Sequence, residues 1–230
     1  MGDAAQVATG EGAASAAPAG TRTVRVWDPL VRLGHWGLAA AFLVAYLGEG
    51  EPMTVHQVAG YAALGIVAVR IVWGFVGPRH ARFSDFVTGP VAVWRYLVGL
   101  VTGRAERRLG HSPAGGAMTV ALLLCVLGTA GTGVARLAIE EGEGPLAPIL
   151  AQADALPRLS FVSPARADED EGERGEGGGG EESLAGEAHE VLANLTLGLV
   201  LLHLAGVAAA GVAHRENLVV AMITGRKRAA

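Results

Sequence analysis

The sequence predicts an all-α integral membrane protein, a four-helix bundle with both termini in the cytoplasm. Hydrophobic residues make up 51% of the chain and charged residues only 17%, well below the roughly 25% typical of soluble domains. The apolar residues are concentrated in a few long blocks rather than spread along the chain. Because a bilayer core of about 30 Å needs around 20 helical residues, we expect spans at about 29–48, 56–76, 113–136 and 188–213.

The first span has the shortest apolar block, which runs only from about Leu33 to Leu47. Asp28 suits a helix N-cap, and Pro29 suits the first helical turn. A helix that begins at this dipeptide gains enough residues to cross the bilayer. We therefore expect the first span to start near Pro29.

The orientation follows from the basic residues, which mark cytoplasmic connections. Arginines and lysine are concentrated before the first span, between spans two and three, and after span four. The short connection between spans one and two holds Glu49 and Glu51, and the connection 140–188 holds thirteen acids against three arginines. This alternation predicts a multi-pass protein of a bacterial inner membrane, with the lipid bilayer as its surroundings.

The remaining segments are assigned by composition. Residues 1–22 predict a disordered cytoplasmic tail, 23–225 a single membrane domain, and 226–230 a basic tail. Within 83–101, aromatic residues interrupted by Pro90 and charged residues predict an amphipathic helix at the cytoplasmic interface. The acidic periplasmic loop 140–187 contains a Gly/Glu-rich stretch, 167–182, that we expect to be flexible. Trp27, Trp36 and Trp73 suit an interfacial aromatic belt.

Histidines within the apolar blocks are the main indication of function. An ionisable residue inside a membrane span is costly and usually has a partner in the bundle interior. His189 and His203 are 14 residues apart on the fourth span, which is about 21 Å along a helix and nearly the same helical face. Their partners should therefore lie at two different depths.

Two further histidines match those depths. His56 begins the second span beside the short periplasmic loop, at the level of His189. His35 lies deeper in the first span, at the level of His203. Two histidines that fill both axial positions of a haem iron favour electron transfer over oxygen chemistry. We therefore expect two b-type haems, with His35, His56, His189 and His203 as the iron ligands.

Two arginines and three further histidines lie outside this set of four iron ligands. Arg70 shares a helical face with His56, and Arg136 ends the third span, so either suits a haem propionate. Snorkelling to the interface is an equally good interpretation of both arginines. Three histidines fall outside the matched depths, and ordinary surface roles are expected for His80, His111 and His214.

Several other functions remain open or are excluded. Hydrogen bonding of the histidines within a haem-free small membrane transporter is the alternative to haem ligation. The single Cys125 excludes an intramolecular disulfide and covalent haem attachment through two cysteines. No phosphate-binding loop, nucleophile triad or nucleic-acid patch is present, and we expect no nucleic-acid partner.

Sequence motifs add a family resemblance that covers most of residues 23–221. The motifs are Val26–Trp36, His56–Tyr61, Arg70–Phe86, the Gly-His-x-Pro element Gly110–Pro113, and His189 through His203. In combination they resemble the bacterial cytochrome b561 family, which includes the hydrogenase-type cytochrome b subunits. The resemblance implies a four-helix cytochrome with two haems, ligated by the same four histidines.

The resemblance also implies partners. Such proteins exchange electrons with quinones and with redox partner proteins, and we expect a quinone and a periplasmic c-type cytochrome or dehydrogenase subunit here. The acidic loop suits the steering of a basic c-type cytochrome. The alternative within the same family is a membrane-anchoring cytochrome b subunit of a hydrogenase or other respiratory dehydrogenase.

Overall fold

The computed structural model describes residues 22–48, 53–155 and 183–229. Its four long helices are α1 (Pro29–Leu47), α2 (Met53–Val76), α5 (Pro113–Arg136) and α7 (Leu184–His214). All four are long and apolar enough to cross a membrane. The predicted all-α class with four long apolar helices is confirmed, and the orientation of the termini stays a prediction. Helix α7 begins at Leu184, somewhat before the predicted start.

Shorter elements connect and flank these helices. They are the strands β1 (Thr23–Arg25) and β2 (Arg226–Arg228), the helices α3 (Phe83–Phe86), α4 (Pro90–Val101), α6 (Ala147–Ala155) and α8 (Leu218–Thr224), the 3₁₀-helix η1 (Arg79–Ala81), and the π-helix η2 (Leu137–Glu141). The predicted tail 1–22, apart from Arg22, and the Gly/Glu-rich stretch 167–182 lie outside the described residues.

Side-chain caps define where three of the long helices begin. The Asp28 carboxylate accepts hydrogen bonds from the amides of Leu30 (2.9 Å) and Val31 (3.1 Å). Ser112 and Ser183 cap α5 and α7 in the same way, each through an amide three residues later. These bonds satisfy amides that have no partner within the helix. The cap at Asp28 agrees with the predicted start of the first span.

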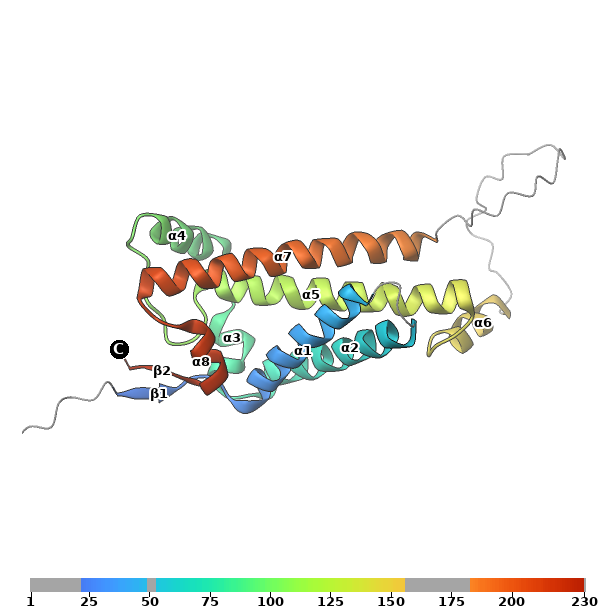
Figure 1. The fold of residues 1–230 in the computed structure, drawn as a ribbon, viewed down its shortest axis with the longest axis horizontal. Coiled ribbons are helices and arrows are strands. Elements are labelled where there is room, and N and C mark those ends of the chain that lie inside the picture. Colours follow the sequence, from blue (N-terminus) through green and yellow to red (C-terminus); the bar gives the residue numbers. More distant parts are fainter. Residues whose placement is uncertain (1–21, 49–52, 156–182, 230) are drawn as a thin grey trace, which may run out of the picture.

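The bundle consists of two antiparallel helix pairs. The most extensive contacts join α5 to α7 and α1 to α2, while α2 and α5 connect the two pairs. The strands, α3, α4 and α8 lie at one end of the bundle, which we call the basic end (Figure 1). The π-helix η2, α6 and the start of α7 lie at the other, which we call the acidic end.

The buried core of the bundle is small. Ala63 and Val67 on α2 pack against Leu123 and Val126 on α5. Most outward-facing apolar side chains on the four helices remain exposed, among them Leu43, Val72 and Leu201. Such surfaces suit contact with lipid rather than with water.

A second cluster closes the basic end. Trp27 is only 7% exposed and packs with Val26, Val31 and Ala81, so the prediction that it belongs to an interfacial belt is wrong. The tryptophan is covered because the chain ends meet beside it: β1 pairs with β2 in antiparallel register. The predicted basic tail is therefore partly a strand.

Glu216 holds this closure together electrostatically. Its carboxylate lies 3.0 Å from Arg107 Nη2 and 3.5 Å from Lys227 Nζ. Lys227 is itself buried, at 7% exposure. Breaking a buried pair by removing one partner is costly because the other charge stays buried.

Local backbone features also depart from the sequence-based expectation. The stretch 83–101 is two helices, α3 and α4, separated by an extended segment before Pro90. Proline is favoured at a first helical turn and disfavours helical conformation in the residue before it. The third long helix continues as a π-helix, which ends at Gly142 in the left-handed region (φ 66°).

Replacing Glu216 with glutamine should destabilise the protein. The amide keeps the shape of the carboxylate but leaves Lys227 buried without a negative charge, so we expect the free energy of unfolding to fall by about 3 kcal/mol. Thermal unfolding in detergent measures this loss. The exposed Glu106 in the same region provides the control, since Glu106→Gln should leave the transition unchanged. Equal melting curves for both variants would contradict the role of Glu216.

Candidate functional site: two facing histidine pairs

The fold brings the four selected histidines together as two pairs. His35 on α1 faces His203 on α7, with ring centroids 6.3 Å apart. His56 on α2 faces His189, also on α7, at 5.9 Å. All four side chains are half-buried. The pairing expected from helix depth is therefore the pairing found in the structure.

The separations match what one shared metal ion requires. Two imidazoles that ligate an ion from opposite sides, at about 2.0–2.1 Å each, have ring centroids roughly 6 Å apart. Among the described residues, no group of three or more His, Cys, Asp or Glu side chains gathers as a metal site. Each pair presents two facing imidazoles, and a haem iron takes two axial ligands.

At the acidic end, backbone carbonyls orient both imidazoles. Nδ1 of His56 lies 2.9 Å from the Ala45 carbonyl oxygen, and Nδ1 of His189 lies 2.8 Å from that of Thr129. A carbonyl only accepts, so each Nδ1 carries the proton and donates it. Each Nε2 then holds the lone pair that a metal ion needs.

The approach of His189 to α5 requires a glycine. A methyl group built on Gly133 would lie 2.9 Å from Cε1 and 3.1 Å from Nδ1 of His189. By contrast, a methyl group on Gly131, on the same helix, would meet nothing within 4 Å. Gly133 thus leaves the space through which the imidazole reaches the Thr129 carbonyl.

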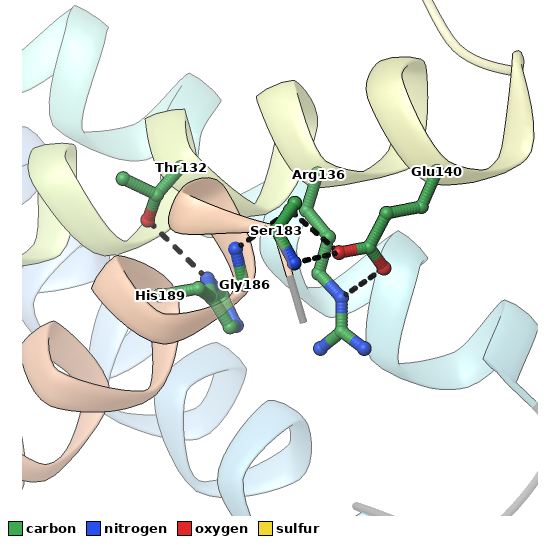
Figure 2. A network of polar contacts seen from close by, with 6 residues as sticks. All are labelled: Thr132, Arg136, Glu140, Ser183, Gly186 and His189. Carbon is green, nitrogen blue, oxygen red and sulfur yellow. Dashed lines mark hydrogen bonds and ion pairs between the residues drawn. The ribbon is translucent and has the colours of Figure 1, made fainter. Parts of the chain in front are cut away.

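A polar network fixes the first turn of α7, the helix that carries His189 (Figure 2). Arg136 Nε donates to Glu140 Oε2 at 2.8 Å, and the Ser183 hydroxyl donates to Glu140 Oε1 at 2.6 Å. The same hydroxyl accepts from the amide of Gly186 at 3.1 Å. Glu140 therefore links the end of α5 to the start of α7.

Arg136 belongs to the surroundings of the acidic-end pair. A cavity of about 90 Å³ is lined by His56, His189 and Arg136, together with Gly60, Tyr61 and other residues of α2 and α5. In Figure 2 the terminal nitrogens of Arg136 point away from Glu140. Arg136 thus lines the same cavity as both imidazoles of the acidic-end pair.

The basic-end pair has a different environment. Nδ1 of His35 is buried and has no hydrogen-bond partner, and the same holds for both terminal nitrogens of Arg70. The Arg70 guanidinium lies over the rings of Phe83 (5.3 Å) and Phe86 (5.8 Å). Buried polar atoms without partners are rare in native proteins and call for an absent polar group.

The three histidines that were not predicted to ligate a haem lie in different environments. His80 lies 3.1 Å from Asp85, and His214 shares a hydrogen bond with Tyr96. His111 is not a surface residue, contrary to expectation: it packs between Trp27 and Phe86. Burial, together with the positive charges of Arg70 and Lys227, lowers the pKa of His111 to about 3, so its imidazole is neutral near pH 7.

Sequence reasoning missed the residues that support the pairs. Thr129 acts through its backbone carbonyl, and Gly133 acts by leaving space, so neither carries a chemical signature. The pairing of Arg136 with Glu140 had a signal in its four-residue spacing, which places two side chains on one helical face. The partnership of Glu140 with Ser183 had none, because 43 residues separate them.

Replacing Ser183 with alanine should loosen the first turn of α7. The variant loses the cap on Gly186 and the bond to Glu140, and loss of such a cap costs about 1 kcal/mol. Hydrogen–deuterium exchange of residues 184–189 should accelerate, while exchange at the far end of α7 stays the same. Ser183→Thr keeps the hydroxyl and should behave as the wild type. Equal exchange in both variants would argue against the network.

Comparisons with known proteins agree with this arrangement. A family model described as prokaryotic cytochrome b561 matches residues 26–225. The search of curated proteins and the search of solved structures found no match. The family match spans all four long helices and all four paired histidines. The chain therefore belongs to the prokaryotic cytochrome b561 family, which implies electron transfer by haem b within a bacterial membrane.

Proposed function

We propose that the protein carries electrons across the membrane through two b-type haems, one ligated by His35 and His203 and the other by His56 and His189. The observation that supports this most directly is the facing of both imidazole pairs at the separation of one shared ion, 6.3 and 5.9 Å. Their spacing of 14 residues along α7 gives about 21 Å between the two sites. Electrons then cross the bilayer in two stages.

The chain offers what a haem needs at each site. Haem b supplies an iron that takes up and releases one electron. Each histidine pair would hold such an iron from both sides, which would leave no position for oxygen and would favour electron transfer. Gly60 on α2 and Gly206 on α7, which lie near the helical faces of His56 and His203, have open space beside them and leave room for a flat ring. The bundle core is a usual place for such a cofactor.

Two arginines bind the haem propionates in this proposal. Arg70 serves the basic-end haem, because its two terminal nitrogens are buried without an acceptor. Arg136 serves the acidic-end haem, because it lines the same cavity as His56 and His189. The forked guanidinium matches the geometry of a carboxylate.

Exchange of electrons with other molecules takes place at the two ends of the bundle. In the proposal the basic end faces the cytoplasm, in accordance with the distribution of arginines, and a quinone and a redox partner protein deliver or remove electrons. Glu140, Glu141 and Glu143 lie at the acidic end, and Glu141 lines the same cavity as His56 and His189. Negative charge there suits the docking of a basic c-type cytochrome.

Difference spectroscopy tests the haem content. The dithionite-reduced minus oxidised spectrum of the purified protein, with a pyridine haemochrome assay, should give two low-spin b haems per chain. Replacing any one of the four ligands with alanine should remove about one haem, because one axial bond is lost. His214→Ala removes a histidine of similar burial that bonds Tyr96, and both haems should remain. A folded wild-type protein without haem would refute the proposal.

Replacing Gly133 with alanine should damage the acidic-end haem alone. The added methyl group would overlap the His189 ring and push the imidazole away from the Thr129 carbonyl. We expect altered electron paramagnetic resonance signals or loss of one haem, with the other unchanged. Gly131→Ala adds the same methyl group to the same helix, where it meets nothing, and should leave both signals intact. Equal spectra for the two variants would contradict this orientation of His189.

A further inference from the structure

Buried nitrogen atoms without hydrogen-bond partners gather at the basic end. They include both terminal nitrogens of Arg70, the indole nitrogen of Trp73 and Nδ1 of His111. The groups belong to different elements: Arg70 and Trp73 lie on α2, whereas His111 directly precedes the cap of α5.

Shared aromatic neighbours bring these groups together. The Phe86 ring lies 5.8 Å from the Arg70 guanidinium carbon and 4.3 Å, between ring centroids, from His111. Trp27 contacts the other side of His111, at 4.7 Å, and Trp73 packs against the cluster that contains Trp27. The three side chains thus share one group of aromatic neighbours at the basic end.

The nearby carboxylates of the chain are engaged elsewhere. Asp28 caps α1, Asp85 lies beside Arg79 and His80, and Glu216 lies between Arg107 and Lys227. An isolated buried guanidinium is costly, since it has lost its water and gained no acceptor. An acceptor from outside the chain would satisfy it.

The donor set defines the chemistry of that acceptor. Arginine and tryptophan side chains only donate hydrogen bonds, and a neutral imidazole carries one N–H. A ligand that meets all three must be rich in acceptors and is best negatively charged. A carboxylate meets both conditions and suits the fork of Arg70.

The helix register places Arg70 close to the basic-end histidine pair. A methyl group on Gly34, next to His35, would lie 3.7 Å from Ile66 on α2, so these residues lie at similar depth. Arg70 follows Ile66 by one helical turn, about 6 Å nearer the basic end. A carboxylate on the edge of a group held between His35 and His203 would point toward it.

We propose that Arg70, Trp73 and His111 form one buried carboxylate site that receives a propionate of the haem held by His35 and His203. The inference rests on the proposed function. It gives the Gly-His-x-Pro element a role: Ser112 and Pro113 start α5 and thereby fix the position of His111. Gly110 allows close packing, since a methyl group there would lie 3.1 Å from His80.

Vibrational spectroscopy of the haem-loaded protein tests the site. Redox-induced infrared difference spectra, recorded with haem labelled with ¹³C at its propionates, report the hydrogen bonding of these carboxylates directly. His111→Phe keeps the aromatic packing and removes the donor. The labelled bands of one haem should shift, its midpoint potential should fall, and its release to a haem-scavenging protein should be about tenfold faster. The midpoint potential falls because a propionate that has lost a hydrogen bond presents more of its negative charge to the iron.

Matched variants distinguish the loss of this carboxylate site from a general disturbance of the fold. His111→Gln restores a donor and should recover most of the wild-type spectrum. Trp73→Phe should act in the same direction as His111→Phe, which keeps the test available if one variant folds poorly. His80→Gln, at the same end but paired with Asp85, should leave the labelled bands unchanged.

Three outcomes would overturn the inference or its basis, and they are distinguishable. Unchanged propionate bands, potentials and release rates in His111→Phe and Arg70→Gln, with two haems bound, would overturn the carboxylate site. Loss of bound phospholipid phosphorus from Arg70→Gln, again with unchanged propionate bands, would show that a lipid headgroup occupies it instead. A wild-type protein without haem would refute the proposed function itself.

Discussion

The imidazoles of two histidine pairs must face one another across the bundle, and much of the structure serves this requirement. Helix α7 contributes one ring to each pair, so its depth and rotation fix both sites at once. The partners come from α1 and α2, which pack closely against each other. Helix α5 packs extensively against α7 and contacts His189. The four-helix arrangement is thus the frame that holds two opposed pairs at different depths.

The two histidine pairs differ in the hydrogen bonding of their imidazole nitrogens. At the acidic end, backbone carbonyls of Ala45 and Thr129 accept from Nδ1, and the Glu140 network fixes the start of α7. At the basic end, Nδ1 of His35 and the nitrogens of Arg70 remain without partners. An acceptor on Nδ1 makes an imidazole a stronger electron donor to a bound metal ion. In the proposed function, this difference would give the basic-end haem the higher potential.

Closure of the basic end is a second structural theme. The chain ends meet as β1 and β2, and Glu216 compensates Arg107 and Lys227 beside them. This closure covers Trp27, which in turn contacts His111. The region shields buried polar groups from water, where electrostatic interactions would be weaker. Segments far apart in sequence therefore combine into one region that contains buried charged side chains.

The sequence by itself determined the membrane spans, their alternating charge and the pairing of four histidines by depth. These properties follow from local rules, because the bilayer thickness fixes span length and the helical rise fixes the level of each residue. Tertiary structure alone decided the burial of His111 and Trp27, the bond between Glu140 and Ser183, and the need for glycine at position 133. Each depends on contacts between segments distant in the chain, whose approach no periodicity records. The depth of a residue in the membrane follows from its position along a helix and can be read from the sequence. Its neighbours on other helices are determined only when the helices pack.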